Sequence, residues 1–209
     1  MIRRLAVLAV MAMLLPLSTA SAQSAVGGRA YVTFGSVWPS ASATFDAVAG
    51  TSRISSVGGG GTVTGLWEGL FVDVGVSRQQ ISGERVFVLD GTAFPLGIPL
   101  EITLRPVDIA AGWRWSSGRV SPYVGGGATF LSYTETADFA QPGEDVSEQT
   151  SGLVILGGFD VAIARWLHAG AEVRYRSITG VLGSGGVSEA FGEDNLGGAA
   201  AAVRVSVGL

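Results

Sequence analysis

Apolar and polar residues alternate with a period of two through much of the chain after residue 27. The clearest case is the C-terminal segment 199–209, where Arg204, Ser206 and Gly208 interrupt an otherwise apolar run at every second position. The same alternation runs through segments 70–77, 107–115, 153–163 and 167–176. A period of two is typical of a strand whose two faces meet different surroundings. These segments are therefore predicted to be strands.

Three further segments, 29–38, 57–66 and 120–133, have strand composition, but glycines obscure which face is which. With them the chain has eight predicted strands, and their connections alternate in length. The short connections are 67–69, 116–119 and 164–166, and the long ones are 39–56, 78–100, 136–150 and 178–197.

The second long connection carries a strand pattern of its own. Residues 85–89 and 98–104 are predicted to extend the third and fourth strands, and to close around Asp90-Gly91. The alternation of the fourth strand changes phase at Pro106, which predicts a β-bulge there.

Overall composition limits where these strands can lie. The chain is 47% hydrophobic, yet after the N-terminal segment no apolar run is long enough to be a spanning helix. Only helices and closed barrels satisfy all backbone hydrogen bonds inside a bilayer. An even strand number, with short turns at one end and long loops at the other, is typical of outer-membrane barrels. We therefore predict an all-β fold, an eight-stranded antiparallel up-and-down transmembrane β-barrel in the cell outer membrane.

The N-terminus has the pattern of an export signal. Arg3 and Arg4 precede the apolar residues 5–17, and Ala20-Ser21-Ala22 matches the small-residue cleavage pattern. The apolar run is shorter than the roughly 20 residues that span a bilayer, which argues against the alternative of a membrane anchor. The predicted organisation is a signal peptide at 1–22 and one barrel domain at 23–209.

Aromatic residues gather beside the predicted short turns. They are Trp67, Trp113, Trp115, Tyr123 and Trp166. Tryptophan and tyrosine favour the boundary between membrane and water, so these residues are predicted to form a girdle at that end.

Charge and residue types exclude several functions. The net charge is −4, with 13 basic residues, all of them arginine, and nucleic-acid binding calls for a basic face. There is no cysteine and a single histidine, so no metal-ligand pattern is present, and no cofactor is expected. The glycine tracts 58–61 and 125–127 lack the sequence context of a phosphate-binding loop. Acidic residues of the last loop, Glu189, Glu193 and Asp194, are interpreted as solvated, with divalent-cation bridging as the alternative.

The sharpest local feature is a set of charged residues that share the inward face of the predicted strands. Their close confinement in a narrow barrel predicts a lumen filled by salt bridges, because an unpaired buried charge is costly. The alternative is a narrow, gated polar path. The predicted lumen charge network consists of Asp73, Asp108, Arg114, Asp160, Glu172, Arg174 and Arg204.

Three segments carry a resemblance to a known family. Residues 122–127 (Pro-Tyr-Val-Gly-Gly-Gly), residues 171–175 (Ala-Glu-Val-Arg-Tyr) and the alternating C-terminus resemble the small outer-membrane β-barrels related to outer-membrane proteins A and X. The family usually ends in an aromatic residue, whereas this chain ends in Leu209. The resemblance implies outer-membrane lipids and the barrel-insertion machinery as partners, together with an unknown partner of the loops.

The function predicted from these features is structural or surface-interacting and non-enzymatic. One alternative is a small channel or ligand transporter. Another is an envelope-lipid-modifying enzyme, since some barrels of this architecture deacylate lipid A with a serine and a histidine. His168 follows a short turn, at the end opposite to such sites, and no serine stands near it in the sequence. No catalytic residues are therefore predicted.

Overall fold

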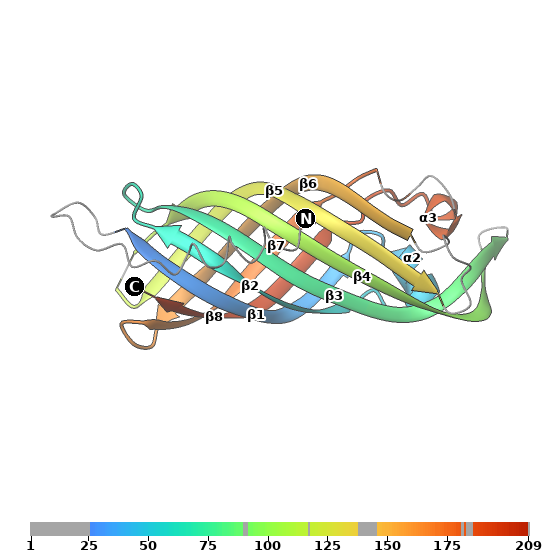
Figure 1. The fold of residues 1–209 in the computed structure, drawn as a ribbon, viewed down its shortest axis with the longest axis horizontal. Coiled ribbons are helices and arrows are strands. Elements are labelled where there is room, and N and C mark those ends of the chain that lie inside the picture. Colours follow the sequence, from blue (N-terminus) through green and yellow to red (C-terminus); the bar gives the residue numbers. More distant parts are fainter. Residues whose placement is uncertain are drawn as a thin grey trace, which may run out of the picture.

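The computed structural model is a closed barrel of eight antiparallel strands, each paired with its neighbours in sequence, and β1 pairs with β8 (Figure 1). It describes residues 26–89, 92–116, 118–137, 146–180, 182 and 186–208. The predicted fold class is confirmed. The signal peptide, the Asp90-Gly91 turn and Leu209 lie outside the described residues. The strands are β1 (Gly27–Pro39), β2 (Ile54–Thr64), β3 (Leu70–Leu89), β4 (Thr92–Arg114), β5 (Val120–Ala137), β6 (Val146–Ala162), β7 (Leu167–Ser177) and β8 (Gly198–Gly208).

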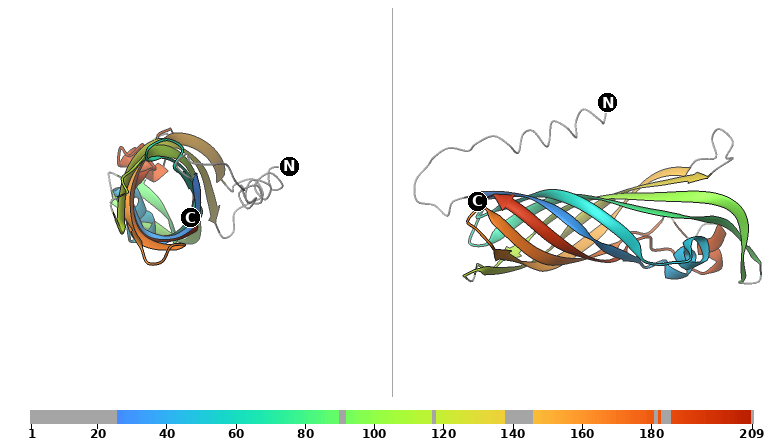
Figure 2. Two further views of the ribbon diagram at one scale, coloured as in Figure 1. Left: turned by 90° about the vertical axis from the view of Figure 1, so that its left-hand side faces the viewer. Right: turned by 90° about the horizontal axis from the view of Figure 1, so that it is seen from below.

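The strands are strongly staggered around the ring. Following the paired residues from Gly28 on β1 through every strand in turn leads back to Trp38, ten residues further along β1. This stagger requires the strands to tilt by about 40° from the barrel axis. Seen along that axis, the strands form one continuous ring (Figure 2, left). A barrel this narrow leaves room for side chains and little else.

The outer face of the barrel carries an apolar band. Its side chains are exposed here because they face outward from the sheet, as expected of residues in contact with lipid. Examples from successive strands are Val32, Val57, Val76, Ile109, Val124, Ile155, Val173 and Val203, each at least 46% exposed.

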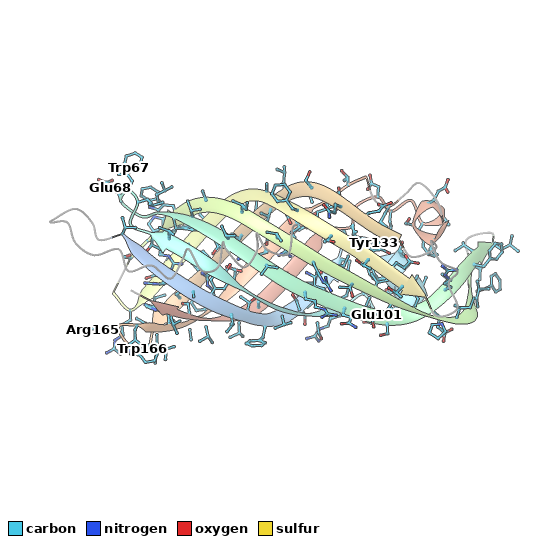
Figure 3. All side chains as sticks on the ribbon, in the orientation of Figure 1. Trp67, Glu68, Glu101, Tyr133, Arg165 and Trp166 are labelled. Carbon is cyan, nitrogen blue, oxygen red and sulfur yellow. The ribbon has the colours of Figure 1, made fainter. Side chains whose placement is uncertain are left out.

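Tryptophans mark the end of this band at the short turns. Trp67 and Trp166 lie at that end (Figure 3), and they are 68% and 57% exposed. Trp113 contacts Trp67 edge to face, with 6.5 Å between ring centroids. The prediction for Tyr123 was wrong, because this residue is 3% exposed and lies inside the barrel.

At the other edge of the band, the apolar side chains pass from the outer face of the sheet to its inner face. On β4, Leu100, Ile102 and Leu104 are buried inside the barrel, whereas Val107 and Ile109 are exposed outside it. This exchange accounts for the change of phase near Pro106, and the predicted bulge there is wrong. Pairing of β4 with β5 continues through Pro106 without a shift, since proline removes a hydrogen-bond donor but adds no residue.

The bulge lies further out, in the long hairpin of β3 and β4. The register shifts between Glu84 and Val86, and Gly97 on the opposite strand has a φ of 68°. Glycine adopts this left-handed conformation without strain. Beyond it, the hairpin projects past the rest of the barrel (Figure 1).

Two short helices lie at the same end as this hairpin (Figure 2, right). They are α2 (Ser42–Ala49), within the first long connection, and α3 (Gly186–Ala190), within the last. Neither was predicted.

None of the helices in the described parts of the chain has the length and apolar character needed to cross a membrane.

Candidate functional site: the filled lumen

All seven residues of the lumen charge network lie inside the barrel, and each is at most 8% exposed. The strands that carry them hold a regular alternation, which turns every second side chain inward. Two arginines that the sequence interpretation left out, Arg29 and Arg176, extend the network through ion pairs. Four carboxylates therefore meet five guanidinium groups.

Arg174 on β7 is the centre of the network. Its Nη1 lies 2.7 Å from Asp108 Oδ2, and its Nη2 lies 3.0 Å from Asp73 Oδ1. Its Nε donates to Glu172, two residues away on the same strand. One side chain thus joins carboxylates from β3, β4 and β7, and such charge-assisted hydrogen bonds are the strongest in proteins.

Each of these carboxylates also has a second partner. Arg176 binds Asp108 with two hydrogen bonds, of 3.0 and 2.7 Å. Tyr31 donates a hydrogen bond of 2.9 Å to Asp73. Asp73 also accepts a hydrogen bond of 2.7 Å from Thr62 on the neighbouring strand. The network therefore does not depend on one ion pair.

Arg204 from β8 closes the other side of the network. Its Nη1 lies 3.0 Å from Glu172 Oε2, and its guanidinium stacks on Tyr31, 3.7 Å from the ring centroid. Tyr123 donates a hydrogen bond of 2.9 Å to the same carboxylate. The two tyrosine rings fill space between the charges, which leaves little volume for solvent.

A second group of charges lies nearer the short turns. Arg114 Nη1 lies 2.7 Å from Asp160 Oδ2, and the Arg114 guanidinium lies 4.6 Å from the ring centroid of Tyr123. Arg29 approaches the same carboxylate at 3.6 Å. His168 is buried beside this group at the start of β7. Within the described residues, no three histidine, cysteine or acidic side chains are placed to hold a metal ion.

The outer half of the lumen is filled by apolar side chains, which we call the plug. Helix α2 contributes Phe45, and the last long connection contributes Ile178 and Leu196. The plug consists of Ala41, Phe45, Ile54, Leu100, Ile102, Leu104, Leu131, Tyr133, Ile178 and Leu196.

A carboxylate fastens the plug to the last connection. Glu193 accepts hydrogen bonds of 3.0 and 2.8 Å from the backbone N–H groups of Ala43 and Thr44, and one of 2.7 Å from the Thr44 hydroxyl. It thus takes up free N–H groups at the start of α2, where a negative charge is favoured. Within the plug, burial raises the pKa of Tyr133, which donates a hydrogen bond of 2.7 Å to Glu135.

A small cavity adjoins the charge network. Its volume is about 40 Å³, and Arg174, Arg176, Asp108 and Glu172 line one side. That volume holds roughly three water molecules. Among the described residues, then, the lumen holds a charge network and an apolar plug, and the cavity beside the network is of water size.

The members of the network that sequence interpretation missed had different signals. Arg176 is the last residue of the alternating segment 167–176 and shares the face of Arg174, so the alternation already indicated its inward direction. Tyr123 lies two residues before a glycine tract that hides the faces of β5. Its burial could have been inferred only from a longer alternation than the sequence shows.

Comparison with known proteins finds similar folds among solved structures. No protein-family model matches the sequence, and no curated protein matches it either. Among solved structures, Ail, the attachment invasion locus protein of Yersinia pestis in complex with the heparin analogue sucrose octasulfate, matches with a TM-score of 0.52 at 9% identity, covering 88% of this chain and 97% of that chain. Neisserial surface protein A matches with a TM-score of 0.51 at 15% identity, covering 87% of this chain and 96% of that chain.

At these identities the likeness concerns the fold, and it confirms the resemblance to small outer-membrane β-barrels that the sequence indicated. The continuous apolar outer band agrees with this class, because a closed barrel with that surface is stable in lipid. The chain therefore has the fold of the small eight-stranded outer-membrane β-barrels.

Proposed function

We propose that this barrel is non-enzymatic, closed to solutes, and acts through surfaces that lie outside the membrane. The observation that carries the proposal is the filling of the lumen at two levels, by the charge network and by the plug. A solute would have to break ion pairs at one level and displace packed apolar side chains at the other. The channel alternative is therefore disfavoured.

The enzyme alternative finds no support in the position of His168. This residue is 7% exposed and faces inward near the short turns, among Arg29, Arg114 and Asp160. It lies away from the end that carries the long connections. A nucleophile and base need to lie within hydrogen-bond reach of each other and of a substrate, and this position offers no access from the outer side.

The projecting hairpin is the surface best suited to an interaction. Four large apolar side chains lie on one face of it, and Phe87 stands opposite Phe94. Exposed apolar side chains that gather in this way mark a binding surface in many proteins. They are Phe87, Leu89, Phe94 and Leu96, at 55%, 55%, 48% and 54% exposure.

Both edges of this hairpin are also free of strand partners within the described residues. Pairing of β2 with β3 ends at Gln79, and pairing of β5 with β4 begins at Leu100. A free edge beside an apolar face suits an extended, alternately apolar segment of a partner protein, which would add to the hairpin as a strand.

Two measurements test the two parts of the proposal. Vesicles that hold the folded barrel should retain small sugars and ions as well as empty vesicles do, and rapid efflux would refute the closed lumen. A phage-displayed peptide library, panned on the barrel in nanodiscs, should yield alternately apolar peptides that the variant Phe87→Ser/Phe94→Ser fails to retain. The matched control is Trp67→Ser, which removes an exposed aromatic at the other end. Equal retention by all three proteins would refute the role of the hairpin.

A further inference from the structure

Outward-facing arginines gather at the outer edge of the apolar band. Arg53, Arg78 and Arg105 lie on or beside three consecutive strands, β2, β3 and β4, and all are exposed. Arg53 is already engaged, since its guanidinium lies 5.9 Å from the ring centroid of Trp38 and donates to Ser36. The other two arginines, Arg78 and Arg105, form a pair across neighbouring strands.

Arg78 and Arg105 stand opposite each other on β3 and β4. The pairs Val76–Val107 and Gln79–Leu104 share one register, and this register places Arg78 across from Arg105 on the outer face. Like charges directly opposite each other destabilise a sheet. Within the described parts of the chain, neither arginine has an acidic group within 4.0 Å.

Arg78 has one polar contact, a hydrogen bond of 2.9 Å to Gln80 on its own strand. The nearest outward carboxylate along β4 is that of Glu101, four residues further out than Arg105 (Figure 3). Two adjacent guanidinium groups without a counter-charge are therefore left at the membrane boundary. An anion between them would remove the repulsion and accept hydrogen bonds from both.

A groove runs beside this pair over β4, β5 and β6. Its volume is about 440 Å³, and Arg105 forms one wall. The side toward the apolar band is lined by Val107 and Phe130, and the far side by Ser132 and Gln149. The groove is thus apolar where it meets the lipid acyl chains, polar where it leaves them, and positively charged at its edge.

We propose that this groove binds a phosphorylated glycolipid of the outer leaflet, with its phosphate between Arg78 and Arg105. The phosphate meets the two guanidinium groups, the sugar hydroxyls meet Ser132 and Gln149, and an acyl chain follows Val107 and Phe130 down the apolar band. Arginine matches the planar, two-pronged hydrogen bonding of phosphate better than any other side chain. The site is formed by the outer face of the sheet and does not depend on the lumen, so a conducting barrel would leave it in place.

The test compares lipid A binding by the folded barrel and by Arg78→Gln/Arg105→Gln, measured by native mass spectrometry from mixed micelles. Both side chains are exposed, and heat-modifiable gel mobility establishes that each variant is folded. We expect about thirtyfold weaker binding, which converts to about 2 kcal/mol, or 1 kcal/mol for each arginine at a membrane surface. Arg78→Lys/Arg105→Lys keeps the charge and should bind at an intermediate level.

Two controls make the result specific. Arg119→Gln/Arg165→Gln removes two exposed arginines at the short-turn end and should bind lipid A as the unmodified barrel does. Lipid A without its phosphates should bind the unmodified barrel about as weakly as intact lipid A binds the glutamine variant. Unchanged binding by Arg78→Gln/Arg105→Gln would overturn the proposal. So would an equal loss in the short-turn control, or undiminished binding of the dephosphorylated lipid.

Discussion

Replacing Arg174 by methionine should destabilise the barrel more than any single change on its surface. Arg174 contacts Asp73, Asp108 and Glu172 at once. Methionine retains much of the volume of the arginine stem, so the measured loss reflects the charge rather than a cavity. The change would leave four guanidinium groups to serve four carboxylates, with none of them central to the network.

The contacts that remain set the magnitude. Breaking a buried pair by removing one partner costs about 3–5 kcal/mol in a dry site. Asp108 would keep its two hydrogen bonds from Arg176, and Glu172 would keep Arg204. The neighbouring cavity of about 40 Å³ would also let water reach the space that the guanidinium leaves. We therefore expect the lower end of the range, about 3 kcal/mol.

The assay is the free energy of unfolding from reversible guanidinium titration in phospholipid vesicles, followed by tryptophan fluorescence. Arg119→Met, at an exposed position, is the matched control and should change stability by less than about 0.5 kcal/mol. In a double-mutant cycle with Glu172→Gln, the two losses should not add, because the residues share the network. A loss for Arg174→Met as small as that of the control would refute the account of the lumen.

Three further changes test other parts of the structure. Val203→Arg, on the lipid-facing side of β8, should make insertion less favourable by about 2–4 kcal/mol. Val203→Leu should leave the yield of folded barrel unchanged. Glu193→Ala should destabilise α2 by about 1 kcal/mol and speed hydrogen exchange of its amides, whereas Glu189→Ala should not. Gly83→Ala should displace α2, because the added Cβ would lie 2.3 Å from a backbone oxygen of that helix, and a crystal structure with α2 in place would contradict this. Ser82→Ala, which faces solvent beside it, is the control.

The alternation of the strands made most of the lumen predictable. Asp73, Glu172, Arg174 and Arg204 stand in regular runs, so their inward direction follows from the period of two. Pro106 shows where the same reasoning went wrong. A change of phase was interpreted as an extra residue, but it records a change of surroundings. From Pro106 toward the short turns, lipid contacts the outer face of the sheet. From Pro106 toward the long connections, the plug contacts its inner face.

The plug could not be predicted from local sequence. Helix α2 is only eight residues long and has no side-chain cap of its own. The carboxylate that caps it belongs to Glu193, 149 residues from Thr44 in the sequence. The apolar cluster that its Phe45 joins includes Leu100 and Leu131, which belong to the distant strands β4 and β5. A helix stabilised by such distant partners leaves no pattern within its own segment.

Single-channel recording in planar bilayers tests the central claim, the closed lumen, most directly. The unmodified barrel should insert, as judged by heat-modifiable mobility of protein recovered from the same vesicles, and show no steady conductance steps. A large porin inserted under the same conditions should conduct and so establish the sensitivity of the recording. Steady, reproducible steps from the unmodified barrel would contradict the account, because the charge network and the plug could not then both be closed.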